Sequence, residues 1–163
     1  MKRLLAILGV TALAVTMVVT PAAATTNRIA IHCDETRISE WIGGRAWLDE
    51  DFVWHIRGQS ADYLDVGSPY CAGINHATVN VNLDLLTGEG LVIAFAQREL
   101  TGFDGGWDAK LVAHFTPGGP YVWVGEVVGH GYGELAGYQY RSTVLETTHE
   151  ATIEDGYVFL PGH

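Results

Sequence analysis

The chain has 163 residues, of which 19 are acidic and 9 are basic, giving a formal net charge of −10 at pH 7. Such an acidic surface repels the phosphates of nucleic acids and anionic lipids, which argues against nucleic-acid binding. Hydrophobic residues make up 48% of the chain, so it can bury the core of one domain.

Residues 1–24 have the order of a secretory signal peptide. Basic Lys2 and Arg3 precede an uncharged apolar run from residue 4 to residue 19, and small residues end the segment at Ala24. The run is shorter than the ~20 residues that a membrane-spanning helix needs. We therefore expect cleavage after Ala24, which leaves residues 25–163 as a single secreted or periplasmic domain without a stable membrane anchor. An uncleaved anchor is the alternative.

The next feature along the chain is its pair of cysteines, Cys33 and Cys71, which are the only two. An even number of cysteines in an exported chain predicts a disulfide, and two cysteines allow one intramolecular pairing. The chain has no CxxC motif, and none of its 7 histidines stands at ligand spacing. We predict a Cys33–Cys71 disulfide, no metal site and no cofactor.

From residue 28 onward, turn signals rich in glycine and proline separate segments with apolar side chains at every second position. These segments are residues 28–33, 44–48, 52–57, 77–85, 91–100, 107–115, 121–128, 138–145 and 156–160. Only residues 37–42 could form a short helix. Connections are short from residue 86 onward, so consecutive strands should pair antiparallel.

This pattern predicts an all-β fold, an eight-stranded antiparallel up-and-down barrel. The alternative is an immunoglobulin-like β-sandwich, which also carries tryptophans between two cysteines. In that fold the second cysteine lies near the end of the domain, whereas Cys71 is followed by more than half of this chain.

Residues 129–137, GHGYGELAG, could be taken for a phosphate-binding loop, but the alternating residues after them predict a glycine-rich turn between strands. The segment resembles the GxGxGxLxG hairpin of allene oxide cyclase-like and dirigent-like barrels. Residues 44–47, 53–58, 80–84 and 155–162 are similar to blocks of small exported bacterial proteins of that barrel type. The resemblance implies an eight-stranded barrel with a central cavity. The family includes cyclases and proteins that guide radical coupling, but we match no position here to the catalytic residues of the cyclases, so the resemblance does not carry their activity over.

Alternation also predicts which side chains face the barrel interior. The expected interior residues are Phe52, Trp54, Ile56, Val79, Val81, Leu83, Ile93, Phe95, Gln97, Trp107, Leu111, Phe115, Tyr121, Trp123, Tyr138, Tyr140, Ser142, Val144 and Glu146. Among them, the candidate ligand-lining residues are Trp54, Phe115, Trp123, Tyr138, Tyr140 and Glu146.

An apolar interior with a few hydroxyl groups suits a small apolar ligand. It equally suits a structural barrel filled by its own side chains. The other alternative is a cyclase or isomerase acting on an apolar substrate. Tyr140 and Glu146 are the only acid–base pair that the sequence offers it, and no catalytic residue is predicted.

The segment 121–128 is apolar on both faces, because Val122, Val124 and Val128 lie opposite Trp123 and Val127. One face fills the barrel, and the other needs a cover. Either residues 37–41 or a second subunit could provide it. We expect a homo-oligomer packed through the barrel wall, since the local segment offers few apolar groups.

Overall fold

The computed structural model describes residues 27–119, 122–148 and 150–161, so the expected signal peptide and Tyr121 lie outside the described residues. These residues form nine strands and no helix. The strands are β1 (Arg28–Arg37), β2 (Arg45–Leu48), β3 (Val53–Gly67), β4 (Gly73–Asp84), β5 (Gly90–Leu100), β6 (Gly105–Phe115), β7 (Trp123–Gly133), β8 (Gln139–Thr148) and β9 (Ala151–Phe159).

All paired strands are antiparallel, and each strand from β3 to β8 pairs with the next in the chain. β1 closes the sheet by pairing with both β9 and β3, so β1 and β3–β9 form an eight-stranded barrel with β2 as an extra strand. The predicted barrel is confirmed, and the sandwich alternative is wrong. Residues 37–42, the only candidate for a short helix, form none, because Arg37 ends β1 and Ile42 forms a bridge with Ser60.

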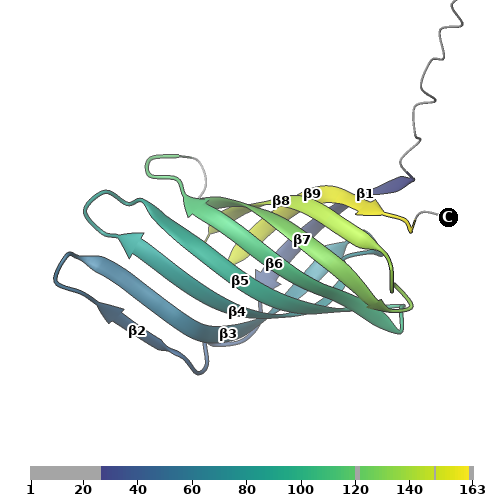
Figure 1. Ribbon diagram of the computed structural model, residues 1–163, viewed down its shortest axis with the longest axis horizontal. Helices are drawn as coiled ribbons and strands as arrows, with labels where there is room; N and C mark the ends of the chain where they lie inside the picture. The colour runs from purple at the N-terminus through teal and green to yellow at the C-terminus, as the bar shows by residue number, and fades with distance from the viewer. Residues whose placement is uncertain (1–26, 120–121, 149, 162–163) are drawn as a thin grey trace, which may run out of the picture.

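The two ends of the barrel differ. β1 pairs with β3 only from Tyr63 to Gly67, and β2 pairs with β3 from Trp54 to Arg57. In the described part of the chain β2 has no strand on its other edge. As a result, β2–β6 extend past the ends of β1, β8 and β9, and this end of the barrel is open on one side (Figure 1). We call it the open end and the opposite one the closed end.

The closed end holds the core. Cys33 and Cys71 form the predicted disulfide, with Cα atoms 6.3 Å apart, and both are fully buried. The Trp107 ring packs edge-on against Tyr140 with centroids 4.9 Å apart, and its Nε1 donates to the Tyr70 carbonyl at 2.8 Å. The disulfide is consistent with an oxidising location, extracellular or periplasmic.

The glycines of residues 129–137 are explained by packing. Gly129 faces inward on β7, where an added Cβ would overlap the ring of Tyr140, and a Cβ added to Gly131 would overlap the backbone carbonyl of Leu135. Gly133 ends β7, and the hairpin then leads to Gln139, where β8 begins. These glycines therefore let an aromatic ring and a tight hairpin approach the backbone closely.

The structure corrects the predicted direction of several side chains. On β5 the buried positions are Val92, Ala94, Arg98 and Leu100, so the inward placement of Ile93, Phe95 and Gln97 is wrong. Residues 91–96 of β5 are apolar on both faces, and their alternation could not decide between the two faces. Phe52, also expected inside, lies in the turn before β3 with a positive φ of 61° and is 53% exposed.

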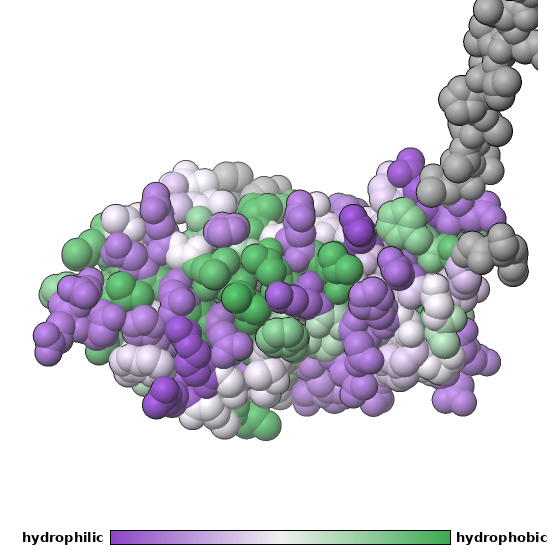
Figure 2. Space-filling view, in the orientation of Figure 1, coloured by the Kyte–Doolittle hydropathy of each residue, from purple (hydrophilic) through white to green (hydrophobic). Residues whose placement is uncertain are grey.

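The outer wall of β5–β7 carries apolar side chains instead. Phe95, Val112 and Val128 are 53%, 37% and 39% exposed on it. Figure 2 shows apolar side chains gathered in the middle of the face that it presents. Residues 37–41 do not cover this wall. They form the end of β1 and the first part of its connection to β2 at the open end, where Trp41 contacts Tyr63.

Candidate functional site

A cavity of about 630 Å³ runs from the open end into the barrel. The interior is hollow because many inward positions carry small side chains, among them Ala77, Ala94, Ala96 and Ala109. A volume of this size is typical of small-molecule sites, which occupy roughly 300–1,000 Å³.

One wall of the cavity is apolar and is built by β4–β7 together with the start of β3. The residues on it are Trp54, Ile56, Ala77, Val79, Val81, Leu83, Val92, Ala94, Ala96, Ala109, Leu111, Phe115, Trp123 and Val127. Regular alternation on neighbouring antiparallel strands places these side chains on one continuous face. Trp54 is 45% exposed, so this wall reaches the solvent at the open end.

The opposite wall is polar and comes from β1, β3 and the β8–β9 hairpin. Its residues are Glu35, Gln59, Tyr63, Glu146, Glu150 and Thr152. The cavity is therefore amphipathic across its width. Its charge is also one-sided, because four glutamates (Glu35, Glu146, Glu150 and Glu154) line it with a single arginine, Arg98.

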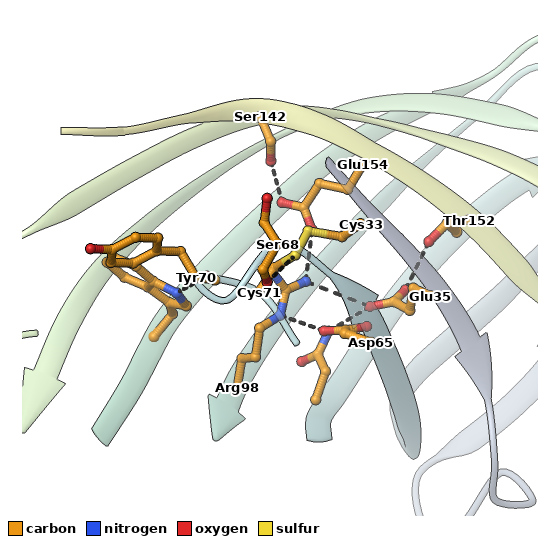
Figure 3. A network of polar contacts seen from close by, with 12 residues as sticks. Cys33, Glu35, Asp65, Ser68, Tyr70, Cys71, Arg98, Ser142, Thr152 and Glu154 are labelled. Carbon is orange, nitrogen blue, oxygen red and sulfur yellow. Dashed lines mark hydrogen bonds and ion pairs between the residues drawn. A yellow bond between two sulfur atoms is a disulfide. The ribbon is translucent and has the colours of Figure 1, made fainter. Parts of the chain in front are cut away.

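The floor of the cavity is a buried network around Arg98 (Figure 3). Arg98 comes from β5, and its Nε lies 2.5 Å from Asp65 Oδ2 on β3. Its Nη2 lies 2.7 Å from Glu154 Oε2 on β9 and 3.8 Å from Glu35 Oε2 on β1. Ser142 donates a hydrogen bond to the second oxygen of Glu154. One guanidinium group thus faces three carboxyl groups.

These groups meet because the strand registers align them. Glu35 is the cross-strand partner of Asp65 on β3 and of Thr152 on β9. Glu35 accepts hydrogen bonds from Asn75 Nδ2 at 2.7 Å and from Thr152 Oγ1 at 3.0 Å. Directly opposed side chains on one face lie within reach of each other.

Burial raises the pKa of Asp65 to about 9; Arg98 opposes the rise and Glu35 adds to it. Asp65 is 1% exposed, so its ionised form loses nearly all hydration. One arginine cannot balance three buried carboxylates, and the network therefore holds a proton at neutral pH.

A second titratable group lies nearer the mouth of the cavity. Burial raises the pKa of Glu146 to about 8, and the nearby Glu35 contributes. Burial also raises the pKa of Tyr63, with smaller contributions from Glu35 and Glu146. Glu146 is consequently a carboxyl group that can exchange a proton near neutral pH.

Five of the six predicted ligand-lining residues lie on the cavity wall: Trp54, Phe115, Trp123, Tyr140 and Glu146. Tyr138 lies away from the cavity and packs against the core cluster of the closed end. Residue 138 directly precedes β8 and is outside its alternation. Tyr140 and Glu146 do not form a pair, because six residues of one strand separate them by ~20 Å.

Sequence reasoning missed the network on the floor. Its signal was present, since Glu154 stands two residues from buried Thr152, and Arg98 stands between inward Ala96 and Leu100. A charged side chain on the inward face of a strand is buried only with a partner. No single segment shows that partner, because each charge lies on a different strand.

The fold and cavity define a closed antiparallel β-barrel with a one-sided opening to an amphipathic chamber. Comparison of the chain with protein-family models, with curated proteins and with solved structures finds no match. The resemblance to allene oxide cyclase-like barrels stays a prediction from sequence motifs.

Among the described residues no group of histidine, cysteine, aspartate or glutamate side chains could hold a metal ion, and no helix is long and apolar enough to cross a membrane.

Proposed function

We propose that this protein binds a small, largely apolar molecule inside its barrel. The observation that carries the proposal is the hollow chamber of about 630 Å³ with a continuous apolar wall that opens to solvent. A barrel serving only as a scaffold gains stability from a filled interior, and small alanines in place of larger side chains forgo that stability.

We further propose that the protein acts outside the cytoplasm. The pattern of residues 1–24 and the buried Cys33–Cys71 disulfide support this location. An extracytoplasmic barrel with an apolar chamber can hold a poorly soluble molecule in water.

Binding can be tested with N-phenyl-1-naphthylamine, an uncharged apolar probe that fluoresces in apolar surroundings. We expect saturable binding with one site per chain. Ala94→Phe should weaken it at least about tenfold, because Ala94 faces the middle of the chamber and a ring there occupies the probe's space. Ala46→Phe, on the exposed face of β2, is the matched control. Fluorescence that does not saturate, or equal loss in both variants, would contradict the proposal.

A second candidate function is proton transfer on an apolar substrate, as an isomerase or cyclase requires. Glu146 favours it, because its pKa is raised to about 8 by burial and it lines the chamber beside Tyr63 and Glu35. A base titrating near neutral pH could remove a proton next to a carbonyl group. The probe is 2-decanone in D₂O, with exchange of its α-protons followed by NMR. Exchange faster than in buffer that is lost in Glu146→Gln supports the reaction, and exchange at the buffer rate contradicts it.

We also propose that a second copy of the chain covers the outer wall of β5–β7. Phe95, Val112 and Val128 are exposed there, and apolar patches of this kind mark contact sites. Sedimentation equilibrium at micromolar concentration should show a homo-oligomer that Phe95→Asp dissociates. The control is Leu86→Asp, which places the same charge at an exposed position of the β4–β5 turn. A monomeric unmodified protein contradicts the proposal.

A further inference from the structure

We infer that the molecule bound in the chamber ends in an alcohol hydroxyl group, which inserts between Asn75 and Arg98 at the floor. This inference rests on the proposed binding function and names the ligand class. It follows from two buried atoms of chamber-lining residues, one acceptor and one donor, that have neither a hydrogen bond nor an ion pair among the described residues.

Asn75 supplies the acceptor. Its side chain lines the chamber and the residue is 6% exposed. Asn75 Nδ2 donates to Glu35 Oε2 at 2.7 Å, and because a carboxylate oxygen can only accept, this contact fixes which way the amide points. Asn75 Oδ1 is then left without a hydrogen-bond partner in the described part of the chain.

Arg98 supplies the donor. The residue lines the chamber and is 4% exposed. Its Nε and Nη2 face Asp65 and Glu154, whereas Nη1 has no hydrogen-bond partner among the described residues. A buried donor or acceptor without a partner is costly, so native proteins rarely leave one unused.

The two side chains that carry the free acceptor and the free donor are neighbours. Asn75 on β4 and Arg98 on β5 are direct cross-strand partners, and both side chains face the chamber. The amide of Asn75 and the guanidinium group of Arg98 also approach the same oxygen, since Glu35 Oε2 lies 2.7 Å from Asn75 Nδ2 and 3.8 Å from Arg98 Nη2. One small polar group can therefore reach both.

Only a group that both donates and accepts satisfies the pair. An alcohol hydroxyl donates to Asn75 Oδ1 and accepts from Arg98 Nη1. A carboxylate cannot donate, and it would add a negative charge to a chamber lined by four glutamates and one arginine. An ammonium group cannot accept, and it would place a second cation beside the guanidinium group of Arg98.

The rest of the chamber suits an alkyl chain attached to that hydroxyl. The apolar wall continues along β5 from Ala96 to Val92 and ends at Trp54 and Trp123 near the mouth. The strand length from Arg98 to Val92 is ~20 Å, which accommodates a medium-length chain.

The test compares three probes that share one alkyl chain: decan-1-ol, decylamine and decanoate at pH 7. Each is titrated against the protein loaded with N-phenyl-1-naphthylamine. We expect decan-1-ol to displace the dye at a concentration at least about tenfold lower than either charged probe. Equal or tighter binding of decanoate or decylamine would overturn the inference, and so would displacement by none of the three. Failure of the dye itself to bind would instead remove the proposed function.

A variant pair locates the hydroxyl. Asn75→Leu keeps a similar volume but removes the free acceptor, so the affinity for decan-1-ol should fall about tenfold more than the affinity for the dye, which is titrated alone on each variant. Asn80→Leu is the control, because Asn80 lies on the outward face of the same strand and bonds to Gly58 N. Unchanged decan-1-ol affinity in Asn75→Leu overturns the inference. If that variant does not fold, the order of the three probes on the unmodified protein decides.

Discussion

The two ends of the barrel are built by the same strands and have opposite properties. At the closed end Trp107, Val158 and the disulfide are completely buried, and the nearby Arg98 and Glu154 are buried as an ion pair. At the open end Trp54 and Leu86 are 45% and 74% exposed. One end of each long strand supplies stability, and the other end is free to form a chamber.

The stagger of the strands explains the difference. β3 has 15 residues and β4 has 12, whereas β1, β8 and β9 have between 9 and 10. The shorter strands complete the barrel only at the closed end, where side chains can meet from all directions. Changes at the closed end should therefore reduce stability, and changes at the open end should affect binding.

The largest effect is expected from Arg98→Met. The substitution keeps an unbranched side chain but leaves Asp65, Glu35 and Glu154 without their cation. Breaking a buried ion pair by removing one partner costs about 3–5 kcal/mol. Denaturant unfolding should show this loss, while Arg45→Met on exposed β2 changes stability by less than about 0.5 kcal/mol. A small loss of unfolding free energy in Arg98→Met would mean that the three carboxyl groups become neutral when the guanidinium group is absent.

A matched pair of aromatic truncations compares the ends directly. Trp107→Ala should cost about 3–5 kcal/mol, because Trp107 is 0% exposed and tightly packed. Phe115→Ala should cost only about 1–2 kcal/mol, since the half-buried Phe115 ring borders space that is already empty. Thermal or denaturant melts measure both. Equal losses would mean that the chamber is collapsed in solution.

Removing the disulfide should cost about 2–4 kcal/mol. The bond joins residues separated by 38 positions, and closing a loop of this size restricts the unfolded chain. The double variant Cys33→Ala/Cys71→Ala is compared with the oxidised protein by denaturant unfolding. Because both sulfur atoms lie at the closed end, probe binding at the open end should persist in the folded fraction. Loss of binding without loss of stability would contradict the separation of the ends.

The pH dependence tests the buried carboxyl groups. The pKa of Asp65 is raised to about 9 and that of Glu146 to about 8, so the folded protein keeps protons that the unfolded chain releases above pH ~4. Stability should therefore fall as pH rises from 5 to 8, by up to about 1.4 kcal/mol per pH unit for each retained proton. Asp65→Asn should reduce the slope, and Asp51→Asn, at an exposed position of the turn before β3, is the matched control. A stability that rises with pH would contradict the assignment.

The smallest effect is expected from Leu86→Ser in the turn between β4 and β5. Leu86 is 74% exposed, and the Asp84 carboxylate accepts its backbone N–H in either variant. The free energy of unfolding should change by less than about 0.5 kcal/mol in a denaturant melt. A loss above about 1 kcal/mol would show that the open end contributes to stability.

Much of the fold could be predicted because it depends on local patterns. Strands such as β4 and β6 alternate clearly, and the cysteine count allowed one pairing. The face of β5 that points into the barrel could not be predicted. Phe95 and Ala94 lie on opposite faces and both are apolar, so the pattern does not distinguish the inner face from the outer one. The alanines on the inner faces of β5 and β6 did indicate a chamber, because such small side chains leave the interior unfilled, but this indication was missed.

The floor of the chamber was beyond prediction for a different reason. Arg98, Asp65 and Glu154 come from β5, β3 and β9, and strand register alone brings them together. Register across a closed barrel depends on every turn between the strands. Single-segment patterns therefore indicated that the barrel exists but could not indicate which charges meet inside it.

The double pairing of β1 has a consequence for how the protein folds. Arg28 pairs with Phe159, so the barrel closes only after nearly the whole described chain is available, and such non-local pairing makes folding slow. Until then the edges of β1 and β9 are unpaired and prone to aggregation. The Cys33–Cys71 bond ties β1 to the β3–β4 connection, and an early bond there holds β1 beside β3 while the remaining strands assemble. We expect refolding from the reduced chain to be slower and to lose more protein to aggregates than refolding with the bond intact.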